Sequence, residues 1–264
     1  MTDEPSMKRY NPPPPTRMDR CALAWWQAGY SLTDPLIDRL IRNGQGPLHG
    51  GGLDFDGTDD FVAHGDINAL DSAANATWMF WAYIQTVAAD GFIEKGTAQI
   101  YAYLPSADTS NFATGQAGTW EKKTTTAPVV ANVWAHWAVT YDGGVADPDK
   151  IVIYKNGVAQ TLTGSNPGTT LSDQGANAVN VGRTQGVNYI DAILALVKVW
   201  NATLTAAEVQ NEMNSYRPVR TTSLLLWSPY DDGTSARDYS GAGNHGTVTG
   251  ALQVAGPPVS FGGD

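Results

Sequence analysis

Four aspartates stand within seven residues in the first quarter of the chain. They are Asp54, Asp56, Asp59 and Asp60. Carboxylate oxygens are ligands that Ca²⁺ prefers, so this cluster indicates a cation site, although its glycine and glutamate positions are not those of an EF-hand loop. Side chains alternate between faces along a strand, so the four cannot all converge, and we predict Asp56 and Asp59 as the metal ligands. The alternative is that both carboxylates bond the amides of a turn.

Glutamates limit the enzyme chemistry that this chain could perform. The chain has five: Glu4, Glu94, Glu121, Glu208 and Glu212. Retaining glycoside hydrolysis needs two carboxyl groups about 5–5.5 Å apart, and the one pairing left open is Glu94 with Glu121. No Gly-x-Ser-x-Gly nucleophile elbow occurs. We therefore predict that the protein is not an enzyme.

Aromatic residues that could stack on a sugar ring gather in residues 77–84 and in one loop. Rings alternate between both faces of the strand predicted there, and one of those faces must be core. The other face is covered by a loop or available to a ligand. We predict Trp81 and Tyr83 as ligand-binding residues, together with Trp120 in a Gly-Thr-Trp-Glu-Lys-Lys loop. Taken singly, each ring is also typical of core packing.

Composition and charge exclude several classes of protein. The chain has 264 residues, a net charge of -10, and nine Trp and eleven Tyr, which is not the composition of a disordered protein. An acidic surface repels nucleic acid and anionic lipid, so we predict neither as a partner. No apolar run approaches the roughly 20 residues of a membrane helix. The single Cys21 excludes an internal disulfide framework.

Four consecutive prolines near the N-terminus predict an extended arm. They are Pro12, Pro13, Pro14 and Pro15. Such a run favours the polyproline II conformation, which offers no donors to a sheet. A mobile tail is the alternative, but we favour an arm that binds a neighbouring subunit through these prolines. The start of the sequence lacks the apolar stretch of a secretory signal, so we expect no export signal.

The body of the chain has the pattern of short strands. The clearest strands are predicted over residues 77–84, 134–141, 151–154 and 193–200, and Asn156-Gly157 predicts a hairpin. Helices are predicted over residues 34–44 and 205–216, the second beginning with the capping box Thr205-Ala-Ala-Glu208. We divide the chain into a Pro-rich arm (1–20), a leading segment with a short helix (21–52), a β domain (53–217), and C-terminal strands that complete or extend it (218–264).

Five motifs follow one another over residues 53–213. They are Phe55-Asp-Gly-Thr-Asp-Asp-Phe-Val62, Thr77-Trp-Met-Phe-Trp81, Trp134-Ala-His-Trp-Ala-Val-Thr-Tyr-Asp-Gly143, Tyr154-Lys-Asn-Gly157, and Asn201-Ala-Thr-Leu-Thr205 with Glu208-Val209. In this order the sequence resembles the laminin-G-like, concanavalin A-like jelly-roll domains of bacterial and phage proteins. The run from Asp238 to Gly246 resembles a segment that such domains carry at their front, which indicates a second, truncated domain or a permuted strand.

The resemblance implies an all-β fold, a two-sheet antiparallel jelly-roll sandwich, here with a Pro-rich N-terminal arm and one or two short helices. Related jelly rolls include glucan hydrolases whose two glutamates follow a Glu-x-Asp-x-x-Glu pattern, and this chain lacks that pattern. In the resembling domains a further acidic metal ligand often comes from the closing strand. Here that position holds Ala195-Leu196, with Asp191 four residues earlier.

These observations predict a non-catalytic, lectin-like structural or adhesion protein. We expect a phage virion component, a capsid decoration or a tail-associated protein, held by its arm to other virion subunits or to copies of itself. Its location would be the virion surface, or alternatively the extracellular space, and a cell-surface glycan is its candidate ligand. The alternative function is a free carbohydrate-binding protein assisted by Ca²⁺, the candidate cofactor; a glucan hydrolase is the least favoured.

Overall fold

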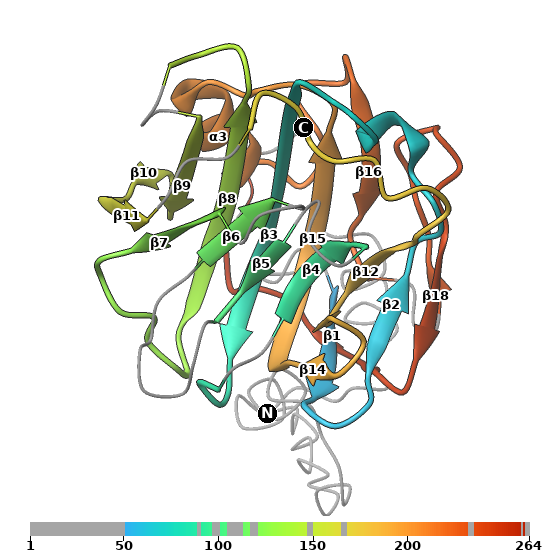
Figure 1. The fold of residues 1–264 in the computed structure, drawn as a ribbon. Coiled ribbons are helices and arrows are strands. Elements are labelled where there is room, and N and C mark those ends of the chain that lie inside the picture. Colours follow the sequence, from blue (N-terminus) through green and yellow to red (C-terminus); the bar gives the residue numbers. More distant parts are fainter. Residues whose placement is uncertain are drawn as a thin grey trace, which may run out of the picture.

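The computed structural model describes residues 51–88, 91–96, 101–104, 113–116, 121–146, 150–164, 168–231, 235–259 and 261. These residues form two antiparallel sheets packed face to face, which confirms the predicted jelly-roll sandwich (Figure 1). The predicted Pro-rich arm, the helix predicted over residues 34–44 and Trp120 lie outside the described residues.

The first sheet has eight strands in the order β10-β9-β8-β3-β15-β1-β19, and β16 pairs with the edge of β15 that β1 also uses. Its strands are β1 (Gly51–Asp56), β3 (Asn75–Ile84), β8 (Trp134–Asp142), β9 (Ile151–Lys155), β10 (Val158–Ala159), β15 (Asp191–Trp200), β16 (Leu224–Ser228) and β19 (Leu252–Ala255). The four strands predicted most clearly from the sequence are β3, β8, β9 and β15.

The second sheet has nine strands in the order β11-β7-β6-β5-β4-β12-β2-β18-β17. Its strands are β2 (Phe61–Ala63), β4 (Gly91–Lys95), β5 (Tyr101–Tyr103), β6 (Ala113–Gln116), β7 (Glu121–Thr125), β11 (Leu162–Gly164), β12 (Val179–Val181), β17 (Ser235–Ala236) and β18 (Gly246–Thr249). A small hairpin of β13 (Arg183–Thr184) and β14 (Asn188–Tyr189) follows β12, and a 3₁₀ turn, η1 (Asn68–Leu70), follows β2.

The core lies between the two sheets and is built from alternate residues of their strands. On β3, the buried Trp78 and Phe80 face inward, and the ring of Phe80 stacks on that of Phe92 from the second sheet at 5.2 Å. Burial of these large rings is the main favourable contribution to folding. The intervening residues of β3, Met79 and Trp81, therefore face outward from the sandwich.

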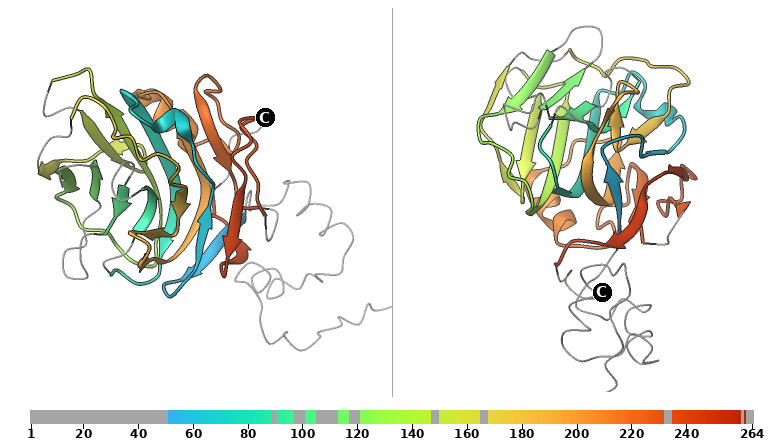
Figure 2. Two further views of the ribbon diagram at one scale, coloured as in Figure 1. Left: turned by 45° about the vertical axis from the view of Figure 1, so that its right-hand side comes forward. Right: turned by 90° about the horizontal axis from the view of Figure 1, so that it is seen from below.

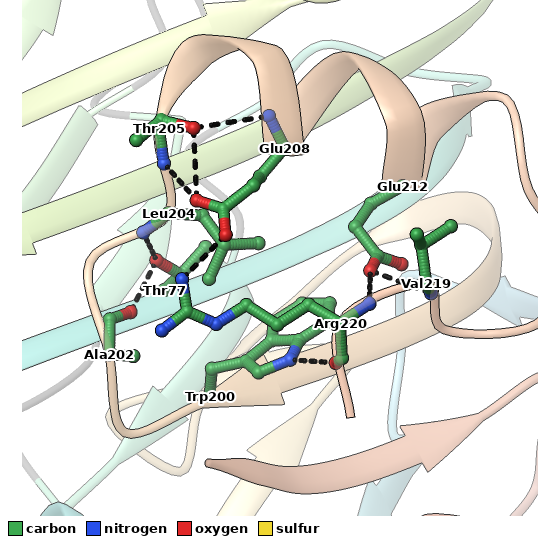
Figure 3. Close-up of polar contacts among 9 residues, drawn as sticks. All are labelled: Thr77, Trp200, Ala202, Leu204, Thr205, Glu208, Glu212, Val219 and Arg220. Atoms are coloured by element: carbon green, nitrogen blue, oxygen red, sulfur yellow. Dashed lines mark hydrogen bonds and ion pairs between the residues drawn. The ribbon is translucent and has the colours of Figure 1, made fainter. Parts of the chain in front are cut away.

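One helix, α3 (Ala206–Met213), covers the outer face of the first sheet (Figure 3). Thr205 and Glu208 form the predicted capping box, so that prediction is confirmed. Arg220 pairs with Glu208 at 2.7 Å, and the Trp200 indole donates to the Arg220 carbonyl at 2.8 Å. None of the described helices is long and apolar enough to cross a membrane.

A buried ion pair fixes α3 to the sheet. Lys198 Nζ lies 2.8 Å from Glu212 Oε2 and also donates to the carbonyl of Ser215 at 3.0 Å. The other carboxylate oxygen, Glu212 Oε1, accepts from the amides of Val219 at 2.8 Å and Arg220 at 2.7 Å. The helix ends at Met213 rather than at residue 216 as predicted, and Lys198 Nζ donates to the Glu212 carbonyl at this end.

The C-terminal strands lie in the same two sheets as the rest of the described chain. β18 pairs with β2 and β19 pairs with β1, so strands from both ends of the described sequence lie side by side (Figure 2). The buried His64 joins these parts, because its ring nitrogens lie 3.1 Å from the Tyr230 hydroxyl and 3.0 Å from the Asn244 carbonyl. Burial lowers the pKa of His64 to about 4.

The loop before β18 is organised by one buried carboxylate. Asp238 accepts hydrogen bonds from the amides of Trp227, Ser240 and Asn244 at 2.8–3.0 Å. Backbone amides that would otherwise be unpaired are satisfied in this way. The run from Asp238 to Gly246, singled out in the sequence, thus closes one edge of the sandwich.

Candidate functional site

Three carboxylates meet at the turn between β1 and β2. The ligand atoms of Asp56, Asp59 and Asp60 all lie within 4.8 Å of one another, and we call these residues the acidic trio. Asp56 and Asp59 are exposed, whereas Asp60 is buried. The structure thus brings the carboxylates of the two predicted metal ligands, Asp56 and Asp59, together and places that of Asp60 beside them.

The trio is shaped by its own backbone. The amide of Thr58 donates to Asp56 Oδ1 at 2.9 Å, and the amide of Asp56 donates to Asp60 Oδ2 at 3.0 Å. Gly57 has a φ of +76°, which a residue with a side chain rarely adopts. The turn-amide alternative therefore holds for Asp56, and the same turn also gathers the three carboxylates.

The turn carries an excess of negative charge. Burial raises the pKa of Asp60, the amide of Asp56 lowers it, and the neighbouring carboxylates raise it further. Burial likewise raises the pKa of Asp54, whose carboxylate accepts from Gln85 Nε2 at 2.7 Å. Within the described part of the chain, no lysine or arginine forms an ion pair with the trio. A bound cation would relieve this repulsion.

The donor set fits a hard cation, since it consists of carboxylate oxygens. The closing strand β15 adds another acid, because Asp191 stands directly opposite Asp56 in the β1–β15 register. A Cβ placed on Gly57 would lie 3.1 Å from the Cβ of Asp191. Asp191 thus stands beside the turn on the neighbouring strand, while the gathered ligand atoms are those of Asp56, Asp59 and Asp60.

The predicted aromatic residues Trp81 and Tyr83 lie on the outer face of the first sheet. Trp81 is 8% exposed and its ring lies edge-on to His136 at 5.4 Å. Tyr83 is half-buried, 5.8 Å from the ring of Trp134, and its β15 partner Ile193 also pairs with Asp54. The ligand-binding roles of Trp81 and Tyr83 stay predictions.

His136 behaves as a packing residue. It is 2% exposed, and burial, followed by the charge of Lys198, lowers the pKa of its imidazole to about 3. The roles predicted for Trp120 and for Pro12, Pro13, Pro14 and Pro15 fall outside the described residues.

The two glutamates that could have supported hydrolysis lie on strands of the second sheet that are not neighbours. Glu94 is on β4 and Glu121 on β7, with β5 and β6 between them. Three strand spacings put the two backbones about 14 Å apart, far beyond the separation of a retaining pair. Glu94 is 4% exposed and accepts from the amide of Gln185 at 2.6 Å. Burial raises the pKa of Glu94, and the charge of Arg183 is among the influences that lower it.

Sequence reasoning missed a polar group on the outer face of the second sheet. The guanidinium carbon of Arg183 lies 3.5 Å from the centre of the Phe61 ring. Arg183 Nη2 donates to Asn180 Oδ1 at 3.3 Å, and Asn180 also donates to Glu94 at 3.4 Å. The sequence carried one sign of this group, which is that Phe61 directly follows the aspartates. The other residues of the group are brought together by the register of the β-sheet and not by their spacing along the chain.

The fold and the comparison of families define the class of this protein. A family model of the concanavalin A-like lectin/glucanases superfamily matches residues 56–210, more than half of the chain. The chain belongs to this superfamily. No curated protein sequence matches it.

Several solved structures share the fold. A candidate carbohydrate binding protein from Bacteroides ovatus matches with a TM-score of 0.60 and 17% identity, over 78% of this chain and 60% of that one. A heptameric pentraxin from Limulus polyphemus has a TM-score of 0.48 and 12% identity, covering 61% of this chain and 81% of its own. Domain 4 of an arabinanase from Geobacillus stearothermophilus, in complex with arabinotriose, has a TM-score of 0.46 and 14% identity, covering 66% and 95%. At these identities the likeness shows the fold alone.

Proposed function

We propose that this protein is a non-catalytic carbohydrate-binding protein whose site is the acidic trio with Ca²⁺. The observation that carries the proposal is the convergence of three carboxylates, without a positive partner among the described residues, in the turn that joins the two sheets of a lectin-type sandwich. The separation of Glu94 from Glu121 supports the non-catalytic part.

Each member of the trio has a distinct part in this proposal. Asp56 and Asp59 are exposed and would hold the cation where a ligand can reach it. Asp60 is buried beneath them and is fixed by the amide of Asp56 and by Gly250, on which a Cβ would clash with Asp60 Oδ1. When bound, Ca²⁺ supplies open coordination positions for sugar hydroxyl oxygens.

Thermal unfolding with CaCl₂ and with chelator tests the cation site. We expect Ca²⁺ to raise the unfolding temperature of the wild-type protein, because a ligand that binds only the folded state stabilises it. Asp59→Asn should lose most of this increase. Asp173→Asn is the matched control, since Asp173 also caps a turn, by accepting from the amide of Gly175 at 2.7 Å, but lies outside the trio.

A glycan array probed with and without chelator tests the carbohydrate part. The expected result is binding to at least one glycan class that chelator removes and Asp59→Asn weakens. An unfolding temperature indifferent to Ca²⁺ in the wild-type protein would reject the cation site. Release of reducing sugar from a bound glycan would reject the non-catalytic assignment.

A further inference from the structure

A row of aromatic rings lies on the outer face of the first sheet. Trp227 of β16 stands directly opposite Lys198 of β15, whose side chain reaches Glu212 of α3, so the indole is on the same outer face. The indole ring is 6.0 Å from the ring of Tyr216 and 5.7 Å from that of Tyr239. We call Tyr216, Trp227 and Tyr239 the aromatic row.

The aromatic row is partly exposed and holds a donor that the described residues leave unpaired. Tyr239 is 43% exposed, and the guanidinium carbon of Arg237 lies 5.3 Å from the centre of its ring. Trp227 is half-buried, and its buried indole nitrogen has no hydrogen-bond partner among the described residues. The indoles of Trp78 and Trp137 are unpaired too, but at 1% exposure they are sealed in the core. The Trp227 donor, next to an exposed ring, indicates a partner that brings a carbonyl oxygen.

Residues 1–50 join the described body close to this row. Gly51 begins β1, and a Cβ placed on it would lie 2.4 Å from the carbonyl oxygen of Tyr230 and 2.7 Å from the Cα of Asp231. Asp231 in turn accepts a hydrogen bond from the hydroxyl of Tyr216, a member of the row. The segment that precedes Gly51 is therefore connected to the body beside the aromatic row.

The chemistry of residues 8–20 fits such a row. Their sequence is Lys8-Arg-Tyr-Asn-Pro-Pro-Pro-Pro-Thr-Arg-Met-Asp-Arg20, with a Pro-x-x-Pro pattern from Pro12 to Pro15. Segments of this pattern dock on aromatic surfaces as polyproline II helices, whose carbonyls are free to accept because they have no internal hydrogen bonds. Residues 8–20 carry four Lys and Arg against one Asp, whereas residues 51–264 carry ten against 21 Asp and Glu. The charge of the segment is therefore complementary to that of the body.

We propose that Pro12–Pro15 bind the aromatic row of their own chain. The proline rings pack on Tyr216 and Tyr239, and Trp227 Nε1 donates to a proline carbonyl. The sequence predicted that these prolines bind a neighbouring subunit, and the position of Gly51 instead favours the body of the same chain. Residues 16–50 tether the prolines to that body and so keep them at a high effective concentration at the row. This inference does not rest on the cation site.

Limited trypsin digestion of the full chain tests the proposal, because Arg17 and Arg20 are cleavage sites close to the prolines. We expect Tyr239→Ala, and a variant with all four prolines changed to alanine, to be cut there about tenfold faster than the wild-type protein, since an aromatic anchor supplies much of such a contact. Tyr189→Ala is the matched control, because Tyr189 is a half-buried tyrosine on β14, outside the row. The wild-type rate should not depend on protein concentration.

A synthetic peptide of residues 8–20 tests the contact directly, when it is added to the full chain whose own four prolines are alanines. Isothermal titration should show binding that Trp227→Phe weakens, because this change keeps an aromatic ring and removes the indole N–H. Raised salt should also weaken binding, since the peptide and the body have opposite charge. A peptide with alanines in place of its prolines should not bind. Thermal unfolding confirms that each variant is folded.

Several results would overturn the inference. They are equal cleavage of Tyr239→Ala and the wild-type protein, equal binding of the alanine and the proline peptide, or a glycan bound at the row in place of the prolines. Protection that grows with protein concentration would assign the prolines to a second copy and would overturn the contact within one chain. CaCl₂ and chelator should leave these measurements unchanged, so a failure here is distinguishable from a failure of the cation site.

Discussion

Buried charged groups on the outer faces of the two sheets differ in whether they are paired. On the first sheet, Lys198 is matched by Glu212 and by two backbone carbonyls, and both oxygens of Glu212 are also bonded. On the second, the Nε of Arg183 has no hydrogen-bond partner among the described residues. A charge buried in protein is stable only when paired. The first arrangement holds the fold together, whereas the second leaves one donor unpaired.

The aromatic residues follow the same division. Trp81, one of the rings favoured for sugar binding, packs with Met213 of α3 on the outer face of the first sheet, and Tyr83 projects from the same face of β3. The ring beside the acidic trio is Phe61, which supports an arginine. Unpaired charge therefore distinguishes the candidate site better than aromatic content does.

Lys198→Met should give the largest loss of stability, because it leaves Glu212 buried without its cation. Breaking a buried ion pair costs about 3–5 kcal/mol, measurable by urea denaturation. Lys155→Met is the control: Lys155 lies 5.4 Å from the Trp137 ring in a half-buried position, and its loss should cost below about 1 kcal/mol. Equal losses in both variants would contradict the view that the first face is held by its ion pair.

The second largest loss of stability is expected from a decrease in pH. His64 and His136 have pKa values lowered by burial to about 4 and about 3. The unfolded chain therefore binds protons more readily than the folded one, and stability falls as pH drops below about 6.5. The slope is about 1.4 kcal/mol per pH unit for each histidine. Urea denaturation between pH 7 and pH 5 measures it. His64→Gln should reduce the slope, and an unchanged slope would show that His64 is not buried as a neutral group.

Much of the fold could be predicted because its signals are local. Alternating apolar residues gave β3 and β8, and Asn156-Gly157 gave a hairpin in which both residues have a positive φ, 50° and 74°. The capping box of α3 is also a local pattern. Its C-terminal end, predicted at residue 216, lies at Met213, next to the bonds that Lys198 of β15 makes with Glu212, which the helix's own sequence does not reveal.

The site could be predicted only in part. Asp56 and Asp59 lie in one turn, so their spacing alone indicated that they meet. Asp191 comes to stand opposite Asp56 through the register of β15 with β1, and Arg183 comes to lie over Phe61 through the pairing of β12 with β2, which no short motif encodes. A charge whose partner comes from another strand cannot be recognised as unpaired until the sheet is assembled.

Gly250→Ala tests how tightly the buried end of the acidic trio is closed. Gly250 has a φ of +77°, and a Cβ there would overlap Asp60 Oδ1. Gly243 has a φ of +80° but no atom near the position of a Cβ, so Gly243→Ala carries the backbone penalty alone. That penalty is about 1 kcal/mol. We expect Gly250→Ala to cost roughly 1–2 kcal/mol more by urea denaturation, and to weaken Ca²⁺ binding as well. Equal costs would show that Asp60 can move aside.

Asp60→Asn should change the free energy of unfolding least, and the sign of this change is the most informative one. The raised pKa values of Asp60 and Asp54 mean that the folded, cation-free protein holds protons more tightly than the unfolded chain. Stability in chelator should therefore fall as pH rises above the ordinary value of 3.8, until both groups are ionised.

Removing one of the repelling charges should make the cation-free protein slightly more stable at neutral pH, by roughly a few tenths of a kcal/mol. Ca²⁺ should reverse the order, because the wild-type protein gains more from the cation than Asp60→Asn does. Urea denaturation in chelator and in CaCl₂ measures both quantities, with Asp173→Asn as the control. If Asp60→Asn destabilised the protein equally in both conditions, Asp60 would be a structural carboxylate like Glu212, and the contrast between paired and unpaired charge would not extend to the trio.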